Sequence, residues 1–346
     1  MNLIKPYSKI DILQLTHKRS GEEKIGERVD CVQGDWITDI KNSNASYVLL
    51  GVPEDIGIRA NYGRAGASTA FKPALESFLS QQHNQFLDAS QIFVLGEIFV
   101  EDLMAVAQLL DVRQKSDMLQ LRDLVKSIDE RVTAVIKVLA ENNKIPLVIG
   151  GGHNNAYGLI KGVSMAKGQK ISAINCDAHL DFRSDEGRHS GNGFFCAYQE
   201  GFLKKYAVSG IHEQYNNQFS LNAFRSNPEN LFYRTYESIF IREEITWQEA
   251  LKQSISFVSI EVCGVEIDLD AITNVPTSAK TSSGISPVQA RQFIYQCANR
   301  LNCAYLHIAE AAPVLSHLKA DNKTGKLIAY LLSDFIKALS QKSSLK

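Results

Sequence analysis

Short apolar runs alternate regularly with longer amphipathic segments along most of this chain, and this pattern limits the folds open to it. Runs at 47–53, 92–96, 146–149 and 171–176 have the composition of buried strands, and a glycine or an acidic residue follows each. The segment 117–143 carries apolar residues at the spacing of one helix face. Strands that alternate with helices pack as a mostly parallel sheet with helices on both faces. We therefore predict an α/β protein.

The rest of the chain continues this pattern, with no internal repeat and no low-complexity tract. The further strands expected are 207–211, 265–269 and 304–308, and the further helices are 68–79, 155–165, 287–300 and 324–339. Residues 1–45 are polar and weakly patterned, so we predict an N-terminal arm there and a single domain over residues 46–346.

Composition excludes several classes of protein. The net charge of −1 and the lack of a long basic run argue against nucleic-acid binding. No run reaches the roughly 20 apolar residues of a membrane span, and the N-terminus lacks the apolar core of a signal peptide. The six cysteines are scattered without CxxC spacing, which indicates reduced thiols. We expect a cytoplasmic protein without a membrane partner.

The segment Asp177-Ala178-His179-Leu180-Asp181 follows an apolar strand directly. In an extended chain, residues two apart point to one face, so two carboxylates and one imidazole would converge. Crowded carboxylates repel one another unless some stay protonated or a cation joins them. A divalent metal therefore fits this segment, and the alternative is a cluster of solvated charges at a strand end.

Two further elements strengthen the metal hypothesis. Asp268-Leu269-Asp270 repeats the spacing on a second strand, although a lone DxD is more often a surface feature. Glu266 has the same parity but lies deeper in the strand, which argues against a role for it. The glycines before His153 allow a sharp turn, and the Lys of a P-loop is absent there. Taken alone, His153 could equally be a core or capping histidine.

Together these elements supply two histidines and four aspartates from three strand ends. Mixed His and Asp ligation suits Mn²⁺, and also Zn²⁺ or Fe²⁺, whereas sets of oxygens alone would indicate Mg²⁺ or Ca²⁺. Six protein ligands are too many for one catalytic metal with an open position. They suffice for two ions, about 3.5 Å apart, that share a hydroxide.

These motifs resemble the arginase/agmatinase/formimidoylglutamase family of ureohydrolases. The matching pieces are GGGHNNAYG, NCDAHLDFR, EIDLD and HIAEAAP, together with GVPEDIGIRANYGRAGAS near the N-terminus. The resemblance covers about residues 47–339. It implies an arginase-like, three-layer αβα fold with a parallel sheet, two Mn²⁺ per chain, a small amidine or guanidine substrate and a homo-oligomer.

The resemblance also implies a role for each matching residue. One Mn²⁺ would be held by His153, Asp177, Asp181 and Asp268, and the other by Asp177, His179, Asp268 and Asp270. Asp181 would also accept a hydrogen bond from the bridging hydroxide, which attacks the amidine or guanidine carbon. Glu310 lies where the family places a carboxylate that binds the cationic end of the substrate; the alternative is an ordinary carboxylate at a strand end.

The substrate is indicated by smaller features. Phe194 occupies the position of the shuttle histidine of arginases, and we interpret nearby His189 as a solvated loop histidine. The glycine directly before His153, where typical arginases have aspartate, and Arg183 both resemble the formimidoylglutamase branch. Arg183 could pair with an acidic substrate or with a carboxylate of the protein. The chain departs from the family pattern at residues 271–274, in the loop that follows them and at Asn154. These differences leave the substrate undetermined, but they do not affect the expected metal ligands.

Formimidoylglutamate hydrolysis to glutamate and formamide is the favoured hypothesis. Arginase, agmatinase or another guanidino hydrolase that releases urea is the alternative within the same chemistry. A catalytically inactive scaffold or regulator is an alternative of another class, and the intact ligand set argues against it. A DxD phosphatase would use Mg²⁺ and an aspartyl nucleophile, and the two histidines argue against that hypothesis.

Overall fold

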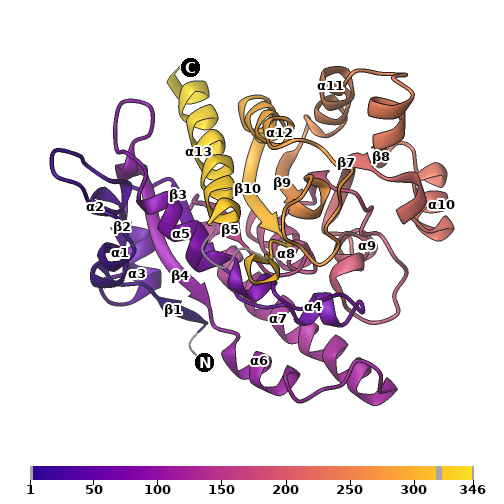
Figure 1. Ribbon diagram of the computed structural model, residues 1–346, viewed down its shortest axis with the longest axis horizontal. Coiled ribbons are helices and arrows are strands. Elements are labelled where there is room, and N and C mark those ends of the chain that lie inside the picture. Colours follow the sequence, from indigo (N-terminus) through magenta and orange to yellow (C-terminus); the bar gives the residue numbers. More distant parts are fainter. Residues whose placement is uncertain (1–2, 317–321, 345–346) are drawn as a thin grey trace.

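A ten-stranded sheet forms the centre of the computed structural model, which describes residues 3–316 and 322–344 (Figure 1). The strand order is β1-β4-β3-β5-β10-β9-β6-β7-β8, and β2 pairs with β4 outside this path. The strands are β1 (Ile4–Pro6), β2 (Asp30–Cys31), β3 (Tyr47–Gly51), β4 (Ile92–Ile98), β5 (Ile145–Ile149), β6 (Ile171–Cys176), β7 (Leu203–Ile211), β8 (Leu231–Thr235), β9 (Val262–Asp268) and β10 (Asn302–Ala309).

The strand pairs are parallel except for β1 with β4, which confirms the predicted α/β class and mostly parallel sheet. Successive side chains along each strand point to opposite faces of the sheet and pack into two separate hydrophobic cores. In β3, for example, Leu49 packs into one core while Val48 and Leu50 pack into the other. Both faces of the sheet are therefore buried, as a parallel sheet requires.

Helices cover both faces and give three layers. One core includes residues of α5 (Phe71–Leu79), α11 (Trp247–Val258), α12 (Pro287–Arg300) and α13 (Lys323–Ser344). The other includes residues of α6 (Glu101–Ala107), α7 (Lys115–Glu141), α8 (Asn155–Lys167), α9 (Gly193–Gln199) and α10 (Gln218–Ser226). Figure 1 shows α12 and α13 on one side of the strands, and α6 and α7 on the other.

The helices predicted from periodicity are present in the structure. The helix predicted at 287–300 is α12, and the one predicted at 117–143 is α7. Strand β8 and helices α6, α9, α10 and α11 were not predicted; most of them are short, and α11 is an amphipathic helix whose periodicity was overlooked. The remaining helices are α1 (Lys9–Gln14), α2 (Ile25–Arg28), α3 (Trp36–Asn42) and α4 (Ile56–Arg59).

The predicted N-terminal arm contributes strands to the sheet. β1 pairs antiparallel with β4, and β2 pairs with the same strand in parallel. These strands are too short to give a periodic signal. They form because β4 has an edge that is not paired with β3, and both strands pair with β4 there. The division between an arm at 1–45 and a domain at 46–346 stays a prediction, and residues 1–2, 317–321 and 345–346 lie outside the described residues.

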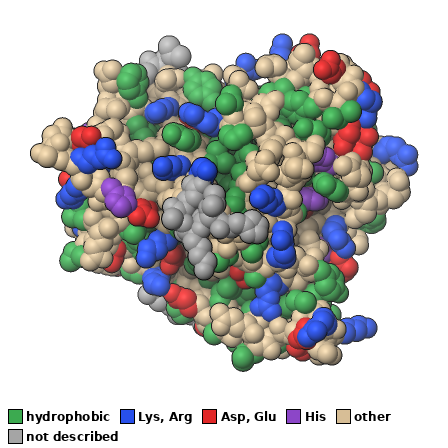
Figure 2. Space-filling view, in the orientation of Figure 1, with side chains coloured by type: hydrophobic (Ala, Val, Ile, Leu, Met, Phe, Trp, Pro, Cys, Tyr) green, Lys and Arg blue, Asp and Glu red, His purple; other side chains and the backbone are tan. Residues whose placement is uncertain are grey.

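Charged side chains of both signs are mixed over the face drawn in Figure 2, with apolar side chains between them. Within the described part of the chain, no helix is long and apolar enough to cross a membrane.

Strand order decides where functional residues can meet. Strands β5, β10, β9 and β6 are consecutive neighbours at the middle of the sheet. Their carboxyl ends lie at one edge, which is where parallel α/β sheets bind ligands. The carboxyl ends of β5, β9 and β6, with the chain segments that follow them, carry all the metal ligands expected from the sequence.

Candidate metal centre

The six predicted ligands lie together beyond the ends of three of these strands. His153 follows β5, Asp177 follows β6 directly, and Asp268 is the last residue of β9. Two groups have ligand atoms within 4.8 Å of one another: His153, Asp177, Asp181 and Asp268 form the first, and Asp177, His179 and Asp270 form the second. We call these six residues the metal-centre floor.

His153 stands among three carboxylates. Its Nδ1 lies 3.2 Å from Asp177 Oδ2, 3.0 Å from Asp181 Oδ2 and 3.3 Å from Asp268 Oδ2. The side chain of His153 is completely buried. One ring nitrogen therefore faces a concentrated negative charge with no access to bulk water.

His179 makes the second group with Asp270. Its Nδ1 lies 3.3 Å from Asp270 Oδ2 and 3.5 Å from Asp177 Oδ1. Asp177 thus presents one oxygen to each histidine. A carboxylate in that position is suited to join two cations.

Two matching turns produce this convergence, and the extended geometry expected from the sequence was wrong. Asp177 Oδ1 accepts a hydrogen bond from the backbone N–H of His179 at 2.7 Å, and Asp268 Oδ1 accepts one from the N–H of Asp270 at 2.8 Å. Aspartate often bonds the backbone two residues on in this way. Asp181 has a φ of +46°, a left-handed conformation that extended chain does not contain. The chain therefore curls at both strand ends, and the local hydrogen bonds turn the carboxylates inward.

The glycines before His153 make the sharp turn that the sequence predicts. Gly150 and Gly151 have φ values of +85° and +73°. The fully buried carboxylate of Glu54 holds this turn, because its Oε1 accepts hydrogen bonds from the N–H of Gly152 at 2.8 Å and from Asn155 Nδ2 at 2.7 Å. The opening loop after β3 therefore fixes the loop that carries His153.

The electrostatics of the floor favour a bound cation. Burial raises the pKa of Asp181 to about 6 and that of Asp268 well above its ordinary range. Burial also opposes ionisation of Asp177, but His153 and His179 outweigh it and lower that pKa.

Unpaired atoms make a more direct test of metal binding. Among the described residues, both ring nitrogens of His153 and Oδ1 of Asp270 are buried without a hydrogen-bond partner. Buried polar atoms are normally satisfied, so Nδ1 of His153, which faces the aspartates, and Oδ1 of Asp270 need a ligand. The mixed nitrogen and oxygen donor set fits a divalent transition-metal ion.

A cavity of about 340 Å³ opens above the floor. Its lining includes Asp181, Asp268, Asp270 and Glu310, and the side chain of Glu310 comes from the segment after β10. Glu310 Oε1 accepts a hydrogen bond from the backbone N–H of His153 at 2.9 Å, and burial raises the pKa of Glu310 well above its ordinary range. Glu310 is therefore held within the cavity, where the sequence predicts a substrate-binding carboxylate.

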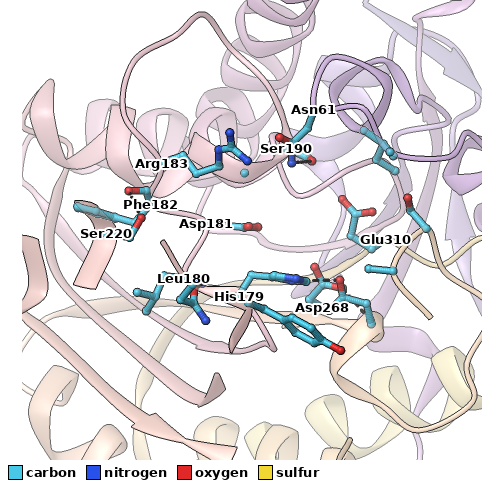
Figure 3. Close-up of a pocket in the computed structure, with 18 of the residues that line it drawn as sticks. Asn61, His179, Leu180, Asp181, Phe182, Arg183, Ser190, Ser220, Asp268 and Glu310 are labelled. Carbon is cyan, nitrogen blue, oxygen red and sulfur yellow. Dashed lines mark hydrogen bonds and ion pairs between the residues drawn. The ribbon is translucent and has the colours of Figure 1, made fainter. Parts of the chain in front are cut away.

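The opposite side of the cavity is lined by uncharged polar side chains and one cation. We call Asn61, Arg183, Ser190 and Ser278 the cavity rim. Figure 3 shows Arg183, Ser190 and Asn61 across the cavity from His179 and Asp268, with Asp181 between the two sides. The cavity thus offers a positive group at the rim and a negative floor.

Arg183 also has a partner within the protein. Its Nη2 lies 2.9 Å from Glu186 Oε1, and the Arg183 side chain is 47% exposed. Glu186 Oε1 is also 3.1 Å from His189 Nε2. His189 itself is fully buried and its Nδ1 accepts a hydrogen bond from the N–H of Gly191, so the prediction of a solvated loop histidine was wrong. Local sequence could not reveal that this loop folds against the protein, so that Ser190 and Gly191 line the cavity and His189 is buried.

Phe194 packs at the floor. It is fully buried, its ring stacks on Tyr206 with centroids 4.2 Å apart, and its edge meets the His153 ring at 5.1 Å. A side chain in this position supports the orientation of His153 and is not able to carry protons.

Glu266 is the site residue that the sequence argument set aside. It is fully buried, and its Oε2 lies 3.3 Å from Nε2 of His153, on the side of the ring away from the aspartates. Burial would raise its pKa, but neighbouring His307 and His153 lower it to about 2. Its parity with Asp268 was the available signal, since residues two apart in a strand share a face.

Comparisons with known proteins show which proteins this chain resembles. A family model described as the arginase family matches residues 45–337. The formimidoylglutamase of Streptococcus pyogenes is 25% identical over 309 residues, which cover 86% of this chain and 86% of that protein.

Solved structures share the fold. A formiminoglutamase variant from Trypanosoma cruzi, solved with Mn²⁺, matches with a TM-score of 0.72 at 17% identity, and covers 93% of this chain and 100% of its own. The formimidoylglutamase of Bacillus subtilis matches with a TM-score of 0.71 at 18% identity, and covers 94% of this chain and 95% of its own. These similarities extend over almost the whole length of each chain.

Proposed function

Because the chain belongs to the arginase family, we propose that it is a manganese-dependent hydrolase that converts formimidoylglutamate and water into glutamate and formamide. The observation that carries this proposal is the cationic side chain of Arg183 across one cavity from the buried carboxylates and histidines of the metal-centre floor. A substrate with an amidine at one end and carboxylates at the other complements both sides.

The floor residues would hold two Mn²⁺. His153, Asp177, Asp181 and Asp268 are the ligands proposed for one ion, and Asp177, His179, Asp268 and Asp270 for the other. The ligand atoms of the first set all lie within 4.8 Å of one another, and so do those of Asp177, His179 and Asp270 in the second set. When bound, a pair of such ions supplies hydroxide at neutral pH and stabilises negative charge at the reacting carbon.

The remaining residues bind and orient the substrate. Arg183 can exchange its exposed pair with Glu186 for a bidentate pair with a substrate carboxylate, because the guanidinium fork matches that geometry. Glu310 can accept hydrogen bonds from the amidine nitrogens through the oxygen that does not contact His153. Asp181 would accept a hydrogen bond from the attacking oxygen. Hydrolysis then breaks the C–N bond, and a proton must reach the leaving nitrogen.

A panel of substrates on Mn²⁺-reconstituted protein tests the proposal. Formamide release from formimidoylglutamate, with little urea from arginine or agmatine, is the expected result. Preferential urea release would assign the chain to the guanidino hydrolases, and no turnover together with no Mn²⁺ uptake would favour an inactive scaffold. Asp270→Ala serves as the control, since it removes a ligand of one ion and leaves the cavity rim intact.

A further inference from the structure

A fully buried polar cluster lies directly beneath the metal-centre floor and has no part in the chemistry described so far. It consists of Glu266 on β9 and of Tyr305 and His307 on the neighbouring strand β10. Tyr305 donates its hydroxyl hydrogen to Glu266 Oε1 at 2.6 Å, and His307 Nδ1 donates to Glu266 Oε2 at 2.6 Å. The Glu266 carboxylate is thereby held on both oxygens.

The cluster is also anchored to the loop that carries His153. His307 Nε2 lies 3.3 Å from the backbone oxygen of Gly150, the first residue of the glycine turn. Gly264 provides the space for the tyrosine ring, because a Cβ at that position would lie 2.2 Å from Tyr305 Cζ. The position of Glu266 is therefore set by packing as well as by hydrogen bonds.

We propose that Glu266 is a positioning residue for His153 in the metal centre. Glu266 Oε2 faces Nε2 of His153 at 3.3 Å, while Nδ1 faces the carboxylates of Asp177, Asp181 and Asp268 at 3.0–3.3 Å. Nε2 makes no hydrogen bond at this distance and angle, but an ionised carboxylate only accepts hydrogen bonds, so its presence beside Nε2 favours hydrogen on that nitrogen. The lone pair of Nδ1 is then left for the cation, and the ring is held in the orientation that metal binding requires.

A separate metal held by His153, Glu266 and His307 is the other way to interpret these atoms, which also lie within 4.8 Å of one another. The distances argue against it. Ligand atoms about 2.1 Å from a tetrahedral metal are about 3.4 Å from each other. Glu266 Oε2 and His307 Nδ1 are 2.6 Å apart, which is the distance of a hydrogen bond.

Stepwise Mn²⁺ titration of metal-free protein tests the inference, which rests on the metal centre of the proposed function. The Glu266→Gln variant should bind one of the two ions about 10- to 100-fold more weakly, because the partner of a ligating histidine typically contributes that much. The other ion should bind within about twofold of wild type. Glu266→Asp keeps the negative charge but moves it one methylene away from His153. The Mn²⁺ affinity of this variant should therefore lie between that of wild type and that of Glu266→Gln.

The Nε2–H signal of His153 gives a readout that general loss of stability does not move. In ¹⁵N-labelled protein loaded with Zn²⁺, which is diamagnetic, the hydrogen on Nε2 should resonate downfield because it faces a carboxylate, and Glu266→Gln should move that signal upfield. Ser254→Ala is the matched control. It removes the buried hydrogen bond between the hydroxyl of Ser254 on α11 and that of Ser209 on β7, away from the metal centre. That variant should lose stability without a change in Mn²⁺ affinity or in the His153 signal.

The possible results separate the two proposals. Wild-type protein that takes up no Mn²⁺ would refute the metal centre itself. Wild-type protein that binds two ions, with Glu266→Gln and Glu266→Asp matching it in affinity and in the Nε2–H signal of His153, would overturn the positioning role alone. If Glu266→Gln does not fold, the same comparison is made with Glu266→Asp, for which an unchanged affinity and an unchanged Nε2–H signal overturn the inference.

Discussion

The metal-centre floor and the cavity rim face each other across one cavity but are built in different ways. The floor comes from the ends of three central strands, β5, β9 and β6, and His153, Asp177 and Asp268 are all buried. The rim comes from loops, and the Arg183 side chain is 47% exposed and paired with another loop residue. Rigid strand ends hold the groups that need precise geometry, whereas loops can change without disturbing them. The floor should therefore set the reaction, and the rim should set the substrate.

Removal of the carboxylate shared by both histidines should have the largest effect. Asp177→Asn is expected to lower kcat by at least about 10³-fold, because stabilisation of charge by two ions accounts for several kcal/mol of catalysis. Metal analysis should find fewer than two Mn²⁺ per chain. An Asp177→Asn variant with two Mn²⁺ per chain and wild-type turnover would refute the assignment of Asp177 as a metal ligand.

Loss of the rim cation should have a smaller and more selective effect. Arg183→Met is expected to lower kcat/KM for formimidoylglutamate by about 10- to 100-fold, mostly through KM, since a charge-assisted bidentate pair is lost. Mn²⁺ content should stay at the wild-type value. As a control, Glu186→Gln frees Arg183 from its partner and should not raise KM; equal losses in both variants would indicate a structural role for the pair.

Bound metal should stabilise the floor against unfolding. The carboxylates of Asp181 and Asp268 are crowded and buried, so Mn²⁺ at about 100 times its Kd should add about 2.7 kcal/mol for each independent site. Thermal melts with Mn²⁺ and with chelator should differ by a few degrees. Asp270→Ala should show a smaller difference, and an unchanged difference would remove Asp270 from the ligand set.

The smallest effect should come from His189, which lies beside the rim. Burial lowers its pKa to about 4, so the unfolded chain, with an ordinary histidine pKa of about 6.5, binds the proton more tightly. The contribution of neutral His189 to stability is therefore complete above pH 6.5 and is lost as the pH falls towards 4. Urea unfolding of metal-free protein should show less pH dependence in His189→Asn across that window.

Much of the site could be predicted from local sequence because each motif that contributes to it spans only a few consecutive residues. The aspartate pairs, His153 and the glycine turn all follow directly on apolar strands, and periodicity identifies those strands well. The geometry within each piece was harder to predict. The turns at Asp177 and Asp268 depend on side-chain to backbone hydrogen bonds, and the left-handed φ of Asp181 leaves no trace in hydropathy.

The sequence by itself determined the α/β class, the identity of the floor residues and their positions at strand ends, because residue type and spacing act over only a few residues. Tertiary structure alone decided that β5, β10, β9 and β6 are neighbours, so that these ends meet. It also buried His189 and placed Glu266 behind His153. Strand order and burial follow from packing between segments that are far apart in the sequence, and the residue spacing within a single motif carries no information about such long-range contacts.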